Sequence, residues 1–358
     1  MDRYVTPQPS PGPEAWRPRA PLDLKAWQPP GAFRERFPWI GGDLQTLRNY
    51  ILRHSADLSP WPSRRIEIGM TDGSGDRLIA EVHEGEEAAR ERPLVLLIHG
   101  LTGCADSAYI RNTARVLLAA GFAVVRMNLR GAGPTAGSGA SASRFHYHAG
   151  RSEDLRDFLT GLREQDSALC AQGFHLAGYS LGANMMLKFL AEYGRDFPVR
   201  AAVSVSAPLD LKATQVRMMA PRNRLYQNYL LERMKAETSA AVLEQAGITR
   251  EALQKLENIF QYDDRVIAPA NGFDGAEDYY RRCSSGAFLE AVAVPSLVIH
   301  AANDPWIPAS SYMAALSLEN PQVRTLLLEK GGHVGFHGRG GEMAWHDAAI
   351  RAVFAKAA

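Results

Sequence analysis

Cysteine is scarce in this chain, and long apolar runs are absent. The 358 residues include three cysteines, Cys104, Cys170 and Cys283, and no CxxC spacing. An odd, scattered set argues against a disulfide framework and a cysteine-based zinc site, and it is typical of a reducing compartment. No stretch approaches the roughly 18 consecutive apolar residues of a membrane span, and the polar, proline-rich start lacks the apolar region of a signal peptide. We therefore expect a soluble, cytoplasmic protein without a stable membrane anchor.

An excess of charge of one sign is also missing. The 40 Lys and Arg residues nearly balance the 39 Asp and Glu residues, which leaves a formal net charge of +1. Without a net field the chain has no general attraction for nucleic acid or acidic membranes, so we expect no nucleic-acid partner. The composition, 46% hydrophobic and 22% charged, is that of an ordinary globular protein whose function depends on particular residues. It leaves the oligomeric state open.

Apolar residues alternate between a strand pattern and a helix pattern over most of the chain. Strand patterns occur at 64–68, 77–82, 93–100, 122–127, 174–179, 199–205, 295–300 and 323–328. Helix patterns separate the later strands or close the chain, at 109–120, 152–164, 181–193, 310–318 and 343–355. This alternation indicates a doubly wound α/β fold around a mostly parallel sheet, here of eight strands.

Two segments interrupt the alternation and define the expected domain organisation. Residues 1–30 contain eight prolines and are expected to form an N-terminal tail. Residues 211–288 contain amphipathic helical pieces and no strand pattern, which indicates an inserted helical cap. The core would then comprise 31–210 and 289–358. A short helix within 33–53 is expected to pack against it.

The stretch Gly178-Tyr179-Ser180-Leu181-Gly182 matches the GxSxG pattern of a nucleophilic serine. It lies between a strand pattern and a helix pattern, and a tight turn in that context projects the serine hydroxyl into a cleft. The amide of Leu181 would face the negative oxygen that develops on an attacked carbonyl. A second donor is expected from Leu101, in the loop after the strand that ends at His99-Gly100. Such a pentapeptide also arises by chance, so its meaning depends on the partners of the serine.

A base and an acid follow in the chain order that an α/β hydrolase uses. His333 follows the last strand pattern, after two glycines, and Asp304 follows the strand pattern before it. His333 would take the proton of Ser180, and Asp304 would orient and stabilise the resulting imidazolium. The sequence thus predicts a catalytic triad.

Two other residues compete for these roles. Asp210 follows the strand pattern at 199–205 and is a second candidate for the acid. We prefer Asp304, because Asp210 is better placed to cap the first helix of the cap segment. Cys104 would be a second nucleophile if a base lay beside it, whereas the other interpretation is a small buried residue.

The motifs together resemble the YheT-like branch of the α/β-hydrolase superfamily, which includes predicted esterases, acyltransferases and phospholipases. The resemblance covers about residues 33–355. It includes the stretches at 41–46, 99–103, 128–131, 147–150, 178–184, 278–280, 304–305 and 332–336. It implies a hydrolase fold, carboxylic ester substrates, and triad roles for Ser180, Asp304 and His333. The chain departs from the family in having Asn303 where a second acid often precedes the proline, and in lacking the eukaryotic membrane anchor.

We therefore expect a serine carboxylic-ester hydrolase that forms an acyl-enzyme on a small-molecule acyl ester or thioester. This chemistry requires no cofactor and no metal. Acyl transfer from a thioester to an alcohol would use the same triad, and a non-catalytic binding protein with a hydrolase fold is a third interpretation. The cap is expected to read the acyl chain through Met218, Met219, Tyr226 and Tyr229, with a preference for short-to-medium chains over acetyl.

Overall fold

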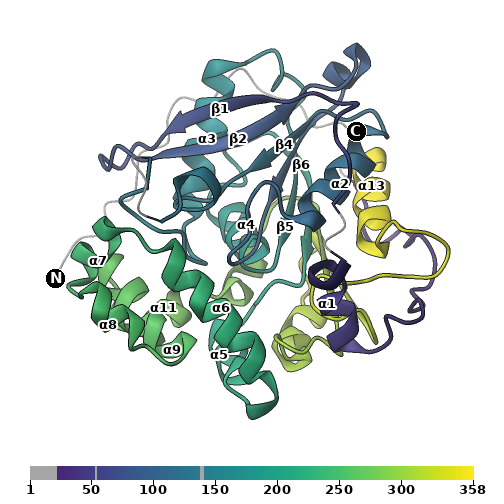
Figure 1. Ribbon diagram of the computed structural model, residues 1–358. Helices are drawn as coiled ribbons and strands as arrows, with labels where there is room; N and C mark the ends of the chain where they lie inside the picture. The colour runs from purple at the N-terminus through teal and green to yellow at the C-terminus, as the bar shows by residue number, and fades with distance from the viewer. Residues whose placement is uncertain (1–21, 53–54, 138–140) are drawn as a thin grey trace.

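One eight-stranded sheet runs through the molecule, with the strand order β1-β2-β4-β3-β5-β6-β7-β8 (Figure 1). The computed structural model describes residues 22–52, 55–137 and 141–358. The strands are β1 (Arg64–Gly69), β2 (Arg77–His83), β3 (Leu94–Ile98), β4 (Val124–Met127), β5 (Phe174–Tyr179), β6 (Val199–Val205), β7 (Ser296–Ala301) and β8 (Val323–Leu328). β2 pairs antiparallel with β1 and β4, whereas the other neighbouring pairs are parallel. The predicted mostly parallel sheet of eight strands is confirmed.

Helices cover both faces of this sheet. They are α2 (Ala108–Leu118) and α13 (Trp345–Ala357) on one face, and α3 (Ser152–Gln165) and α4 (Leu181–Glu192) on the other. Alternate residues of β3 divide between the two faces, because Leu96 packs in the cluster of α3 and α4 while Val95 and Leu97 pack in the cluster of α2 and α13. All five residues of β3 are buried, which explains its unbroken apolar run.

The segment 211–288 is helical and contributes no strand to the sheet. Its helices are α5 (Leu211–Met218), α6 (Arg224–Glu237), α7 (Ala240–Ala246), α8 (Arg250–Gln254), α9 (Ile259–Tyr262), α10 (Ala268–Ala270) and α11 (Ala276–Cys283), with a π-helical turn at Asp263–Ile267. In Figure 1 these green helices gather below the sheet, on the side away from α2 and α13. We refer to this segment as the cap helices.

Two expected helices are shorter than their apolar patterns suggest. The pattern over 250–260 is split into α8 and α9, because the side chain of Asn258 accepts a hydrogen bond from the Gln261 amide at 2.8 Å and starts a new helix. The pattern over 310–318 becomes a 3₁₀ turn followed by α12 (Met313–Leu316). None of the helices in the described ranges is long and apolar enough to cross a membrane.

The N-terminal segment corrects one expectation. Leu24 and Trp27 are buried in the core beside β3 and α13, and Arg324 of β8 donates a hydrogen bond to the Leu24 carbonyl at 2.6 Å. Leu24 and Trp27 therefore pack in the folded core although they fall within the predicted tail, of which residues 1–21 lie outside the described residues. The short helix expected within 33–53 is α1 (Gly42–Leu52).

Candidate active site

Ser180 occupies the turn between β5 and α4 in a backbone conformation that serine rarely adopts. Its φ is 51° and its ψ is −122°, and its amide donates to the Val205 carbonyl of β6 at 2.9 Å. Such a residue costs on the order of 1–3 kcal/mol and persists only where the surroundings hold it. The flanking glycines permit the close packing, because a Cβ on Gly182 would lie 2.1 Å from the His99 carbonyl oxygen and one on Gly178 would lie 2.7 Å from Cα of Ala183.

The hydroxyl of Ser180 begins a chain of three hydrogen-bonded side chains. It lies 2.9 Å from Nε2 of His333, and Nδ1 of His333 lies 2.8 Å from Oδ2 of Asp304. Because the carboxylate can only accept, Nδ1 carries the imidazole proton and Nε2 is free to accept from the serine. Serine, imidazole and carboxylate thus stand in the order that activates a nucleophile.

Asp304 is fully buried and is held as a carboxylate by its hydrogen bonds. Its Oδ1 accepts from the backbone amides of Trp306 and Ile307 at 2.7 and 3.0 Å. Burial alone would raise the pKa of Asp304, but the charge and hydrogen bond of His333, followed by the other donors, lower it below the usual value. The indole of Trp306 also packs on the His333 imidazole, with 4.3 Å between ring centroids.

The competing candidates occupy other environments. Asp210 is exposed and caps α5, where its carboxylate accepts from the Ala213 amide at 2.9 Å. Cys104 is partly exposed in the loop after β3, and no described residue forms a hydrogen bond with its thiol. The structure brings together Ser180, His333 and Asp304 and leaves both competitors outside this chain of contacts.

Helix α1 supports the loop that carries His333, a role that the sequence patterns did not reveal. Thr46 accepts a hydrogen bond from the His333 amide at 2.8 Å, and Gln45 accepts from the His337 amide at 2.7 Å. The loop approaches α1 so closely that a Cβ on Gly332 would lie 2.5 Å from the Gly42 carbonyl oxygen. The signal was the stretch at 41–46, which the family resemblance included without a role.

The loop after β3 presents one free amide beside Ser180. The Gly100 amide donates to the Tyr109 hydroxyl at 2.9 Å, and the Thr102 amide donates to the Tyr147 hydroxyl at 2.6 Å. Between them, the Leu101 amide donates to no described residue. Leu181 is the first residue of α4, where an amide has no partner within the helix, and both leucines line the same cavity as the serine.

Helix α6 of the cap helices also forms hydrogen bonds that hold the loop after β3. Arg233 of α6 donates to the Thr102 carbonyl at 2.7 Å, and Tyr147 donates to Glu237 of α6 at 3.1 Å. Thr102 has a φ of 54°, which is unfavourable for a β-branched residue. The hydrogen bonds of its amide to Tyr147 and of its carbonyl to Arg233 hold the residue in this conformation. Burial raises the pKa of Glu237 to about 7 despite its contacts with Tyr147 and Arg233.

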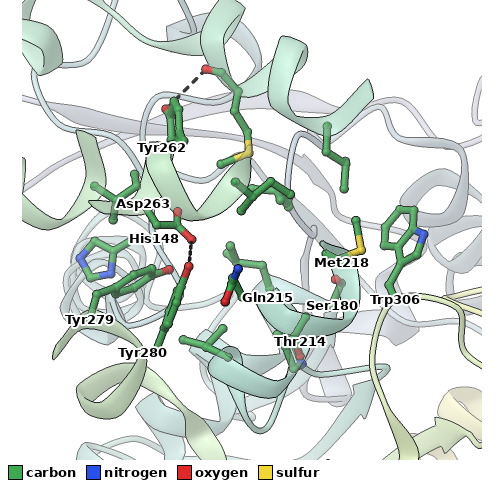
Figure 2. A pocket seen from close by; sticks show the side chains of 18 of the residues that line it. His148, Ser180, Thr214, Gln215, Met218, Tyr262, Asp263, Tyr279, Tyr280 and Trp306 are labelled. Carbon is green, nitrogen blue, oxygen red and sulfur yellow. Dashed lines mark hydrogen bonds between the residues drawn. The ribbon is translucent and has the colours of Figure 1, made fainter. Parts of the chain in front are cut away.

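A mostly apolar cavity of about 110 Å³ extends from Ser180 beneath the cap helices (Figure 2). One water-sized group needs about 10–15 Å³, so the cavity has room for several such groups. Residues from the cap line it together with Leu101, Leu181 and His333; they include Leu211, Thr214, Gln215, Met218, Leu230, Met234, Ile259, Tyr262 and Asp263. The cavity is therefore shaped to receive an extended apolar group next to the serine.

Of the four residues expected to read an acyl chain, only Met218 lines this cavity. The expectation was wrong for the other three. Met219 is 44% exposed at the end of α5, Tyr229 is 45% exposed and packs against Tyr50 of α1, and Tyr226 donates to Asp43 of α1 at 3.0 Å. The physical reason is that α6 lies between the cavity and α1, so part of its apolar stripe serves helix packing.

The chain is similar to known hydrolases in sequence. A family model described as the alpha/beta hydrolase fold matches residues 93–339. The chain is 35% identical over 301 residues to the esterase-named YheT protein of Escherichia coli (strain K12), covering 82% of this chain and 84% of that one. It is 26% identical over 290 residues to the medium-chain fatty acid ethyl ester synthase/esterase 2 of Saccharomyces cerevisiae (strain ATCC 204508 / S288c), covering 74% of this chain and 62% of that one.

The fold is also similar to a solved structure. The Pyrococcus furiosus esterase PF2001 superimposes with a TM-score of 0.51 at 16% identity, over 79% of this chain and 88% of that one. At this identity the likeness concerns the fold alone. The sequence matches, in contrast, extend across the sheet and the cap helices alike.

Proposed function

The chain belongs to the α/β-hydrolase family, in its YheT-like branch, and is an enzyme that hydrolyses esters; we propose that it does so through a triad of Ser180, His333 and Asp304. The observation that carries the proposal is the continuous chain of contacts, 2.9 Å from Ser180 Oγ to His333 Nε2 and 2.8 Å from His333 Nδ1 to Asp304 Oδ2, at a strained strand-to-helix turn. A structural hydrogen-bond network would not require a strained serine at the mouth of an apolar cavity.

The proposed reaction proceeds in two halves. Ser180 Oγ attacks the acyl carbonyl while His333 Nε2 takes its proton, and the negative oxygen lies against the amides of Leu101 and Leu181. His333 then gives the proton to the departing alkoxide, which leaves as the alcohol and leaves the acyl group on the serine. In the second half a water gives its proton to His333 and attacks the acyl-enzyme, and the carboxylic acid departs as the proton returns to Ser180.

Covalent labelling tests the assignment of the nucleophile. A fluorophosphonate probe should modify the wild-type protein at Ser180, as located by peptide mass spectrometry, because only an activated serine attacks it readily. Ser180→Ala should abolish labelling while circular dichroism stays unchanged. Labelling of the variant at the wild-type level would show that another residue is the nucleophile.

The cap helices are proposed to select short-to-medium acyl chains over acetyl. The cavity next to Ser180 is mostly apolar, and each buried methylene contributes about 0.8 kcal/mol, so four added carbons could raise kcat/KM by roughly a hundredfold until the cavity is full. The name of the Saccharomyces cerevisiae relative, which refers to medium-chain fatty acid ethyl esters, supports the same range.

Two adjacent methionines give a matched test of this selection. Met218 lines the cavity, whereas its neighbour Met219 is 44% exposed on the surface. Met218→Ala should change the profile of kcat/KM against acyl-chain length, from acetyl to decanoyl esters, and Met219→Ala should leave it as in the wild type. A flat wild-type profile, or equal profiles for the two variants, would contradict selection by this cavity.

Acyl transfer to an alcohol is the second candidate, because the yeast relative is named both a synthase and an esterase. The same acyl-enzyme would be attacked by an alcohol instead of water. Assays of acyl esters and thioesters with and without added ethanol, in which the new ethyl ester is measured directly, separate hydrolysis from acyl transfer.

The cytoplasmic location, the domain boundaries and an activity confined to small esters stay predictions.

A further inference from the structure

The end of the cavity farthest from Ser180 is polar, although most of its lining is apolar. Figure 2 shows Asp263, Tyr279, Tyr280 and His148 together on one side of the view, while Ser180 lies on the other side beside Met218. Tyr279 and Tyr280 come from α11, and Asp263 begins the π-helical turn. Single π-helical turns occur often at functional sites because they redirect side chains.

Asp263 is a carboxyl group without a counter-charge. It is 8% exposed, and its Oδ2 accepts a hydrogen bond from the Tyr280 hydroxyl at 2.6 Å. Within the described ranges no Lys, Arg or His forms an ion pair with it, and no residue donates to its Oδ1. Burial, together with the charge of Asp264, raises the pKa of Asp263 to about 7. An unpaired carboxyl oxygen beside an apolar cavity is costly unless a ligand satisfies it.

Tyr279 supplies a donor at the same end. Its hydroxyl oxygen accepts from the Ala149 amide at 3.0 Å, and no described residue accepts its own hydrogen. Tyr279 and Asp263 line the same cavity and lie on the same side of the view in Figure 2. Burial and then the charge of Asp263 raise the pKa of Tyr279. This end of the cavity therefore offers an acceptor in Asp263 Oδ1 and a donor in the Tyr279 hydroxyl. His148 lines the same end and carries its proton on Nε2, because its Nδ1 accepts from the Gly150 amide at 3.1 Å. A hydroxyl group has the matching donor and acceptor, whereas an ammonium group has donors only.

The polar end lies on the acyl side of the serine. His333 must protonate the leaving alcohol, so the alcohol departs next to His333 and the indole of Trp306 that packs on it at 4.3 Å. In Figure 2 Trp306 and the Asp263 group lie on opposite sides of Ser180. The chain that reaches Asp263 is consequently the acyl chain.

We propose that the cavity takes acyl chains that carry a hydroxyl group at their far end, with the hydroxyl donating to Asp263 Oδ1 and accepting from Tyr279. This inference rests on the proposed ester hydrolysis at Ser180 and specifies its substrate as esters of hydroxylated fatty acids. A plain alkyl chain would leave the buried carboxyl oxygen dry and unpaired, so the cavity discriminates against it.

The test is a panel of paired ethyl esters, each unsubstituted or with a terminal hydroxyl, from butanoyl to decanoyl. In the wild type at pH 8, where Asp263 is ionised, and at the chain length that spans the cavity, kcat/KM should be roughly tenfold higher for the hydroxylated ester than for its plain partner. Asp263→Leu should bring that ratio below one. Asp274→Asn removes an exposed carboxylate from the loop before α11 and should keep the wild-type ratio. The ratio within each protein is the readout, so an overall loss of stability does not imitate the effect.

A second variant and a binding measurement distinguish failure of this inference from failure of folding or of the proposed function. If Asp263→Leu does not fold, Asp263→Asn retains an acceptor for Tyr280 and replaces the free oxygen by a donor, which should shrink the ratio. If no ester of the panel is hydrolysed, the proposed function fails, and calorimetric titration of Ser180→Ala then decides the inference: tighter binding of the hydroxylated ester supports it, and equal or weaker binding overturns it. A wild-type ratio of one or less at every chain length, or an unchanged ratio in Asp263→Leu, also overturns it.

Discussion

Strained residues concentrate around the candidate site. In the described ranges, the non-glycine residues with positive φ are Thr102, Ser180, Ser206, Val334 and Phe336, and each lies in a loop that follows β3, β5, β6 or β8. Sparsely populated backbone conformations persist where the surroundings over-determine them, and they cluster at active sites. The loops after these parallel strands meet at one edge of the sheet, so the strain supports a preorganised arrangement of nucleophile, base and oxyanion donors.

Asp304 and Asp210 provide a test at the scale of single residues. Asp304→Asn should lower kcat by roughly 10⁴, because the amide no longer fixes the proton on His333 Nδ1. Asp210→Asn should have little effect, since the amide oxygen can still cap α5. Steady-state kinetics on one ester, with melting temperatures to confirm folding, measures both. A larger loss from Asp210→Asn would assign the acid to the loop after β6.

Helix α6 connects the cap to the chemistry at the scale of elements. Arg233→Met removes its hydrogen bond to the Thr102 carbonyl and should lower kcat by roughly three- to tenfold, with little change in KM, because the neighbouring Leu101 amide acts mainly in the transition state. Arg224→Met, an exposed change on the same helix, should leave both constants unaltered. Equal effects of the two variants, or a change in KM alone, would show that α6 does not position the loop.

How far the sequence predicts each element depends on how local its determinants are. The strands, and the meeting of Ser180, His333 and Asp304, could be predicted because an apolar strand pattern precedes each of these residues and because α/β hydrolases use the same chain order. Thr46 could not be predicted as the support of His333, because its contact joins residues 287 positions apart and the stretch at 41–46 does not indicate which residue it contacts. Trp27 was missed for a similar reason. The proline-rich composition around it predicts a tail, and no local pattern shows that this apolar residue packs against the sheet.

The cavity lining was the least predictable part. Tyr226, Tyr229 and Leu230 share the apolar stripe of α6, but only Leu230 faces the cavity, while the two tyrosines pack toward α1 and Trp306. Periodicity shows that a helix has a face to bury and does not show which of two neighbours buries it. Asp263 was missed because its cavity position depends on a π-helical turn, which has no sequence signal.

Buried titratable groups determine how the whole molecule responds to pH. Burial lowers the pKa of His99, His146, His148, His175 and His300, so these histidines are neutral in the folded protein. A folded pKa below the ordinary value of 6.5 means that the unfolded chain binds more protons below that pH, so stability falls as the pH falls from about 6.5. We therefore expect acid conditions to destabilise the fold.

Glu237 and Asp263 act in the opposite direction. Their pKa values rise from 4.5 and 3.8 to about 7, so the folded protein binds more protons than the unfolded chain between those pH values. Each residue therefore makes the fold less stable as the pH rises toward 7.

Glu237→Gln, which keeps the acceptor for Tyr147, should match the wild type near pH 5 and be more stable by roughly 1–3 kcal/mol near pH 8. Urea unfolding at both pH values measures the difference, which cancels the contribution of the histidines. Glu244→Gln, an exposed change on α7, should show no such growth with pH. If the Glu237→Gln difference shrinks or stays constant as the pH rises, the carboxyl is ionised in the fold throughout, and the cap does not hold a protonated acid against the loop after β3.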